Sequence, residues 1–96
     1  MRARLIQSLK LIDKAGGIME RKVWSVPKNE KYPDSIRYRL AYIPAGQKLP
    51  SVLYDNHYPK GHHKHLAGRE TPYEFSGLEQ LLADFSRDIE AQNENA

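Results

Sequence analysis

The 96-residue sequence predicts a single α+β domain, in which a small antiparallel β-sheet of about four strands is flanked by an N-terminal and a C-terminal helix. Two patterns support this prediction. Apolar residues recur at helical spacing near both ends of the chain, and apolar and polar residues alternate in the middle. A chain of this length forms one domain with a small core, so we expect residues 1–96 to fold as one unit.

The first predicted element is an amphipathic helix over residues 2–13, RARLIQSLKLID. This helix would end at the glycines of AGG, residues 15–17, because glycine commonly terminates a helix. The next segment, IMERKVWSV at residues 18–26, is rich in β-forming residues and predicts a strand that ends at Pro27. The apolar residues that share one side of the predicted helix are Leu5, Ile6, Leu9 and Ile12.

The most regular strand pattern is IRYRLAYI, residues 36–43, where apolar and aromatic side chains alternate with Arg37 and Arg39. One face of this strand is therefore predicted to be core, and the other can carry charge. A third strand is predicted after Pro50, and a turn at YPKG, residues 58–61, leads into HHKHL as a fourth strand.

The last predicted element is a C-terminal helix with an apolar inner stripe and an acidic outer face. Ser76 and Glu79 have the spacing of a capping box, which marks a helix start. The polar end AQNENA, residues 91–96, is predicted to be a frayed tail. The stripe is formed by Leu78, Leu81, Leu82, Phe85 and Ile89. Three aromatic residues of the strands are also predicted to lie in the core: Trp24, Tyr38 and Tyr42.

Composition narrows the possible chemistry. The chain has no cysteine, which excludes disulfides, thiolate nucleophiles and cysteine-ligated zinc. The net charge is +3, and residues 31–66 hold six Lys and Arg against two Asp, which favours a polyanionic partner. The sequence has no apolar run long enough to span a membrane and no secretory signal pattern, so we expect a cytoplasmic protein.

Histidines gather around the predicted hairpin between the third and fourth strands. His63 and His65 alternate along the strand, so both side chains are expected on one face, with His62 on the other. Two imidazoles fit metal-free RNA cleavage, in which one group deprotonates the ribose 2′-hydroxyl and another protonates the leaving 5′-oxygen. Strand pairing would bring Asp55 near these histidines, where a carboxylate can orient an imidazole.

Two other interpretations of the hairpin stay open. His63 and His65 could ligate a metal ion, with Asp55 or His57 completing the ligand set from the partner strand. Lys64 and the basic surroundings make a divalent cation less favourable there. The remaining interpretation is a solvent-exposed hairpin whose histidines have neither a catalytic nor a metal-binding role.

Three segments carry a resemblance to a known family: RYRLAYI at 37–43, YDNHYPKGHHKHLAGRETPYEF at 54–75 and LEQLLADFSRDI at 78–89. Over nearly the whole chain the sequence resembles the TumE family of small bacterial and archaeal toxins. The resemblance implies a growth-inhibiting toxin neutralised by a separately encoded antitoxin, commonly one with a DNA-binding helix-turn-helix domain. The predicted layout is also similar to that of RelE-like ribonuclease toxins, at the level of fold only. The most specific matching positions are Tyr54, Asp55, Asn56, Gly61, His63, His65, Gly68, Arg69 and Glu70.

The leading hypothesis is therefore a metal-independent endoribonuclease toxin that uses no cofactor. Its rivals are a non-enzymatic protein that binds nucleic acid or protein, and a metal-dependent nuclease; a homodimer is compatible with each. The predicted catalytic residues are His63 and His65 as base and acid, Lys64 and Arg69 as cations for the phosphate, and Asp55 as an orienting carboxylate. The predicted RNA contacts are Arg37, Arg39, Lys60, Tyr54, Asn56 and Tyr73.

Overall fold

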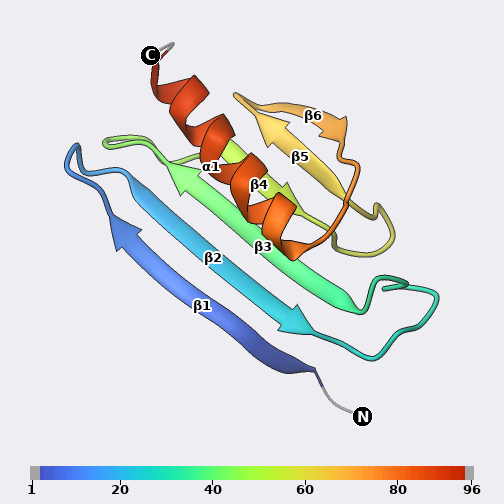
Figure 1. Ribbon diagram of the computed structural model, residues 1–96. Coiled ribbons are helices and arrows are strands. Elements are labelled where there is room, and N and C mark those ends of the chain that lie inside the picture. The colour runs from blue at the N-terminus through green and yellow to red at the C-terminus, as the bar shows by residue number, and fades with distance from the viewer. Residues whose placement is uncertain (1–2, 95–96) are drawn as a thin grey trace.

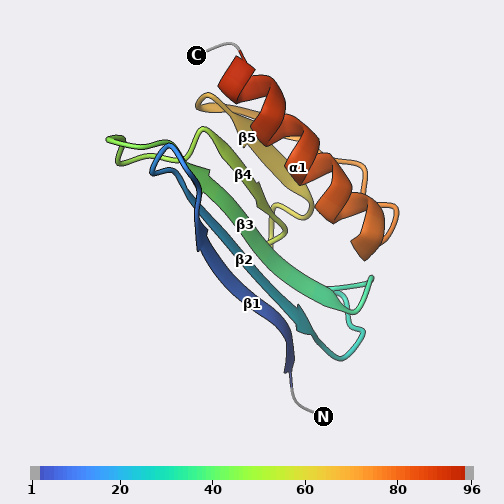
Figure 2. The same cartoon turned by 60° about the vertical axis from the view of Figure 1, so that its left-hand side comes forward.

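Each strand of the sheet pairs with the strand before it, so the sheet is an antiparallel meander (Figure 1). The computed structural model describes residues 3–94, and over this range it contains one six-stranded sheet and one helix, which lies on one face of the sheet (Figure 2). The α+β class is therefore confirmed. The elements are β1 (Arg4–Ile12), β2 (Ile18–Ser25), β3 (Ile36–Ile43), β4 (Val52–Asp55), β5 (His63–Leu66), β6 (Arg69–Pro72) and α1 (Leu78–Glu94).

The predicted N-terminal helix is wrong, because its residues form the edge strand β1. The apolar residues Leu5, Ile6, Leu9 and Ile12 have helical spacing, but pairing with β2 decides for the strand. Leu9 and Leu11 share one face of this strand, and a bulge between Leu5 and Gln7 places Leu5 on the other face. The AGG segment makes the hairpin turn instead of a helix end. There Asp13 accepts hydrogen bonds from the backbone N–H groups of Ala15 and Gly17.

The sheet also has more strands than predicted, since the segment after HHKHL folds back as β6. Ala67 and Gly68 form the two-residue connection, with φ values of 51° and 82°. Positive φ at both central residues defines a type I′ turn, the turn that best fits the twist of a tight hairpin. The turn fixes the pairing of Leu66 with Arg69 and of His65 with Glu70.

The C-terminal helix forms as predicted, but both of its ends differ in detail. The backbone carbonyl of Gly77 accepts the first helical hydrogen bond, from Leu81, so Gly77 takes the N-cap position that Ser76 was predicted to hold. The helix continues to Glu94 and so includes the first four residues of the predicted tail, 91–94, while residues 95–96 lie outside the described part. In the described residues no helix has the length and apolar content to cross a membrane.

The hydrophobic core lies between the sheet and α1, which packs against β4. Tyr38 and Tyr42 are buried in this core as predicted. Trp24 is not, because strand alternation places it on the opposite face, where its ring lies 5.4 Å from the guanidinium carbon of Arg37. The buried apolar and aromatic residues are Val23, Ile36, Tyr38, Leu40, Tyr42, Val52, Tyr54, Leu81 and Phe85.

Buried tyrosine–aspartate pairs hold α1 on the sheet. Asp84 and Asp88 lie one helical turn apart and face the sheet, each 8% exposed, so the acidic residues of α1 are not confined to its outer surface as predicted. The Tyr73 hydroxyl donates to Asp84, and the Tyr54 hydroxyl donates to Asp88. Burial and these bonds raise the pKa of both tyrosines above the usual range. Although burial alone would raise the pKa of Asp84, the bonds from Tyr73 and Gln80 hold it below its ordinary value.

Asn56 continues the pairing of β3 and β4 beyond the last residue of β4. Its side-chain Oδ1 accepts from the backbone N–H of Tyr38 (2.9 Å), and its Nδ2 donates to the backbone carbonyl of Ile36 (2.8 Å). The side chain is buried and satisfies two backbone groups that would otherwise have no partner in the core.

Replacing Asn56 by Ala is expected to lower the free energy of unfolding by about 2 to 3 kcal/mol, because two buried backbone groups lose their partner. Urea denaturation measures the change. The matched control is Asn29→Ala, which removes hydrogen bonds to Pro27, Lys31 and Tyr32 in an exposed loop, where water can replace them. Equal losses in both variants would contradict this account.

Replacing Tyr73 by Phe should destabilise the fold by about 1 to 2 kcal/mol near neutral pH, because it removes a hydrogen bond to an ionised carboxylate. The pKa of Asp84 is lower in the folded protein than in the unfolded chain, where it is about 3.9. Its ionised carboxylate therefore stabilises the fold fully above about pH 3.9, and this stabilisation is lost as the pH falls through the pKa of the folded state. The difference between wild type and variant should therefore shrink below about pH 4. Tyr32→Phe is the control, and a difference that stays constant to pH 2 would refute the assignment.

Candidate active site

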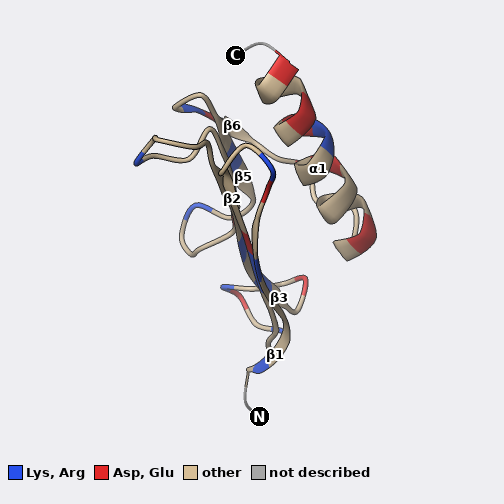
Figure 3. Cartoon of the chain, turned by 90° about the vertical axis from the view of Figure 1, so that its left-hand side faces the viewer, with Lys and Arg blue, Asp and Glu red and all other residues tan. Residues whose placement is uncertain are grey.

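The helix covers one face of the sheet and leaves the opposite face open (Figure 3). Strand pairing places His63 and His65 on this open face. Strand register arranges the side chains of this open face in rows that run across the sheet. One row passes through Lys22, Arg39, Asp55 and His63, and the next passes through Glu20, Ala41, Leu53, His65 and Glu70. The expectation that His63 and His65 share one face, away from His62, is therefore confirmed.

The two imidazoles lie side by side, with ring centroids 5.3 Å apart and ring planes at 70°. His63 is 9% exposed, and its Nδ1 lies 2.9 Å from the backbone carbonyl oxygen of Gly61. A carbonyl oxygen only accepts hydrogen bonds, so Nδ1 must carry the proton. The Nε2 atom of a neutral His63 is therefore left with a free lone pair, which can accept a proton or bind a metal ion.

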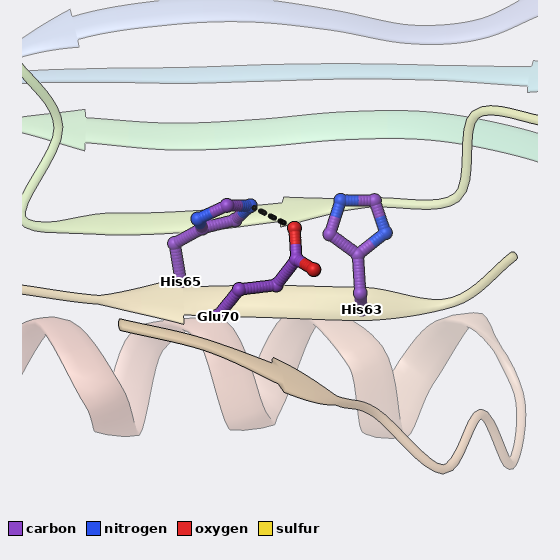
Figure 4. A group of neighbouring side chains, drawn as sticks. All are labelled: His63, His65 and Glu70. Atoms are coloured by element: carbon purple, nitrogen blue, oxygen red, sulfur yellow. Dashed lines mark ion pairs between the residues drawn. The ribbon is translucent and has the colours of Figure 1, made fainter. Parts of the chain in front are cut away.

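Glu70 completes the cluster from β6, directly opposite His65 (Figure 4). Its Oε1 lies 3.2 Å from Nε2 of His65 and 2.7 Å from Nζ of Lys60. The hydrogen bond from Lys60 lowers the pKa of the Glu70 carboxyl group, and the nearby charges of Lys60, His63 and His65 act in the same direction. The Glu70 carboxylate is an acceptor for a hydrogen bond from Nε2–H of His65.

Cations line the same face beside the histidines. Arg39 is separated from His63 by one strand, which corresponds to about 10 Å between backbones. Arg37 and Arg39 border a surface hollow of about 250 Å³ together with Trp24 and Asp55. Lys60 borders a second hollow of about 200 Å³ beside His63 and Glu70.

Two predicted catalytic cations do not join the histidines. Lys64 points to the helix side, because it lies between His63 and His65 in the strand, and its Nζ is 3.1 Å from Asp88 Oδ2. Arg69 pairs with Leu66, which packs against the core, and so it lies on the helix side as well. The nearby cation is Lys60, which was predicted only as an RNA contact.

Three predicted RNA contacts are also part of the folded interior. Tyr54 is fully buried, Tyr73 bonds to Asp84, and Asn56 bonds to the backbone of β3. None of these groups faces the histidine pair. Trp24 lies on the open face, although the sequence predicted it to be a core residue.

Asp55 lies on the open face and pairs with His63 in the register of β4 and β5, but its Oδ1 accepts from the backbone N–H of His57 (2.6 Å). The group that orients His63 is the Gly61 carbonyl. His62 lies on the helix side, where its ring stacks on Phe75 and its Nδ1 is 2.8 Å from the Tyr38 hydroxyl.

Among residues 3–94, the group of side chains that can hold a metal ion is His63, His65 and Glu70. One donor atom from each lies within 4.8 Å of the other two. The sequence had suggested Asp55 or His57 as the third ligand. Glu70 could not be chosen from the sequence, because its position depends on the β5–β6 turn.

Comparison with known proteins decides the family. The family model "Toxin TumE" matches residues 2–93. The chain belongs to the TumE family. The resemblance noted in the sequence is confirmed, and membership of a toxin family supports a toxin role and an antitoxin partner for this TumE protein. The chain matches no curated protein and no solved structure.

A ¹⁵N-edited NMR spectrum can test the orientation of His63. We expect neutral His63 to carry its proton on Nδ1, because the Gly61 carbonyl requires a donor there. His57, which is exposed in the loop, should show the Nε2–H form that free histidine prefers. If neutral His63 instead carries its proton on Nε2, then His63 cannot act as a base through that atom.

Proposed function

We propose that this TumE protein is an endoribonuclease toxin that cleaves RNA by metal-free general acid–base catalysis on the open face. The observation that carries the proposal is the His63–His65 pair, with the rings 5.3 Å apart and each held by a different partner. The Gly61 carbonyl leaves Nε2 of His63 free to accept a proton. The Glu70 carboxylate supports a protonated His65.

In the proposed reaction Nε2 of His63 takes the proton of the ribose 2′-hydroxyl. The 2′-oxygen then forms a bond to the phosphorus atom, and the bond from phosphorus to the 5′-oxygen breaks. His65 gives its proton to that leaving oxygen. The products are a 2′,3′-cyclic phosphate and a free 5′-hydroxyl, so no atom is supplied by a metal ion or cofactor.

Cations of the same face would hold the substrate. Lys60 lies next to Glu70 and can stabilise the negative charge that develops on the phosphate. Arg37 and Arg39 can contact neighbouring phosphates, and the exposed part of Trp24 offers a surface on which a base can stack. We propose that a separately encoded antitoxin, with a DNA-binding helix-turn-helix domain, neutralises the toxin; membership of the toxin family supports such a partner.

Replacing His63 or His65 by Ala should each reduce RNA cleavage by about 10² to 10⁴-fold, the usual contribution of a general acid or base. The purified protein is incubated with RNA in EDTA, and growth is followed in cells that express each variant. Lys48→Ala is the control, because this side chain lies in the exposed loop between β3 and β4, away from the histidines. Circular dichroism should show the wild-type fold for all variants.

If cleavage and toxicity persist in both His63→Ala and His65→Ala, this histidine pair does not catalyse the reaction. If toxicity then disappears when Arg37 and Arg39 are both changed to Glu, the toxin acts by binding instead of cleavage. Activity that is lost in EDTA and restored by a divalent ion would contradict the metal-free mechanism.

A further inference from the structure

We infer that His63, His65 and Glu70 form a binding site for a divalent transition-metal ion, with zinc as the best fit, and that an ion bound there switches off the RNA cleavage proposed above. The first part rests on the geometry of the three residues alone. The second part rests on the proposed function, because it assumes that the same imidazoles transfer protons.

The three side chains nearly form one face of a tetrahedral site. Zinc bonds of about 2.0–2.2 Å place two ligand atoms about 3.4 Å apart. His65 Nε2 and Glu70 Oε1 are already 3.2 Å apart, and one donor atom of each of the three residues lies within 4.8 Å of the others. Figure 4 shows the Glu70 carboxylate between the two rings. Small side-chain rotations are enough to bring the three donors onto one ion.

The backbone already orients one ligand as metal sites require. A metal-bound histidine usually donates its other ring N–H to a carbonyl or carboxylate group, which fixes the ring and makes the bound nitrogen more basic. The Nδ1–H of His63 has this arrangement with Gly61 O. His63 is also largely buried, so its ring is already fixed before an ion binds, and binding does not have to restrict its motion.

The donor set selects the class of ion. Two imidazole nitrogens and one carboxylate suit zinc and related transition metals, and three protein ligands leave a fourth position for water. Magnesium and calcium prefer sites made of oxygen atoms only. We therefore expect zinc to bind in preference to these ions.

The ammonium group of Lys60 disfavours a metal ion at this site. This group is 2.7 Å from Glu70 Oε1, so it competes for the carboxylate and repels a second positive charge. The Lys60 side chain is 61% exposed and can move into solvent. Lys60 should therefore weaken metal binding without preventing it, which makes its removal a sensitive test.

Metal binding and RNA cleavage by this pair exclude each other. An ion bound to Nε2 of His63 occupies the lone pair that would accept the 2′-hydroxyl proton. An ion bound to His65 displaces the proton that would go to the leaving oxygen. Zinc should therefore act as an inhibitor of the proposed nuclease.

Isothermal titration of the full chain with zinc chloride at neutral pH tests the site directly. We expect one ion per chain, abolition of this binding in His63→Ala, and at least tenfold weaker binding in Glu70→Gln. Lys60→Gln should bind zinc about three- to fivefold more tightly, as expected when an exposed competing ion pair is removed. Asp55→Asn should bind as the wild type does.

Two results would overturn the site. One is an Asp55→Asn variant that loses affinity while Glu70→Gln keeps it, because the third ligand would then be Asp55. The other is zinc binding that survives His63→Ala with wild-type affinity and stoichiometry. Each variant is checked by circular dichroism, so that a folding defect is not taken for the loss of a ligand.

The regulatory part is tested with the wild-type protein and RNA. Cleavage measured without added metal should stop with one equivalent of zinc and return with excess EDTA. Zinc that accelerates cleavage, or binds without slowing it, would refute the inhibition. A protein that binds zinc as described but never cleaves RNA would refute the proposed function and leave the metal site standing.

Discussion

The β5–β6 register, set by the Ala67–Gly68 turn, determines which side chains of the open face meet. A type I′ turn of two residues allows one pairing of its flanking strands, and here it places Glu70 opposite His65. A slip of one residue would turn Glu70 to the helix side and bring Arg69 to the histidines. The placement of Glu70 beside the histidines, and with it the proposed metal site, depends on this register.

The two faces of the sheet have separate tasks. On the helix side, Tyr54 and Tyr73 bond to Asp88 and Asp84. Lys64, the residue between the two histidines, pairs with Asp88 and fastens β5 to α1. On the open side, the histidines are therefore carried by a strand whose opposite face is fixed. A catalytic pair needs this kind of rigid support, because proton transfer depends on hydrogen-bond distances.

The sequence could predict what depends on local periodicity, and it could not predict what depends on pairing. Alternation was enough to place Arg37 with Arg39 on one face of β3, and His63 with His65 on one face of β5. The register through β4 is what brings both pairs to the same face of the sheet. Residues 4–12 were predicted to be helical because Leu5, Ile6, Leu9 and Ile12 have helical spacing, and the bulge in β1 interrupts the two-residue alternation that would indicate a strand. Glu70 was not identified as the carboxylate beside His65 because Ala67 lacks the Asn or Asp signal typical of an I′ turn. Trp24 was assigned to the core because aromatic composition does not reveal the face of a strand.

The reaction proposed for the histidine pair produces RNA fragments with characteristic ends. The most direct test is to identify the ends of the RNA fragments that the purified protein produces in EDTA, by mass spectrometry. Attack by the 2′-hydroxyl predicts 2′,3′-cyclic phosphate and 5′-hydroxyl ends, and no cut where the 2′-hydroxyl is replaced by hydrogen. Fragments with 5′-phosphate and 3′-hydroxyl ends, or cleavage at a 2′-deoxy position, would contradict the account.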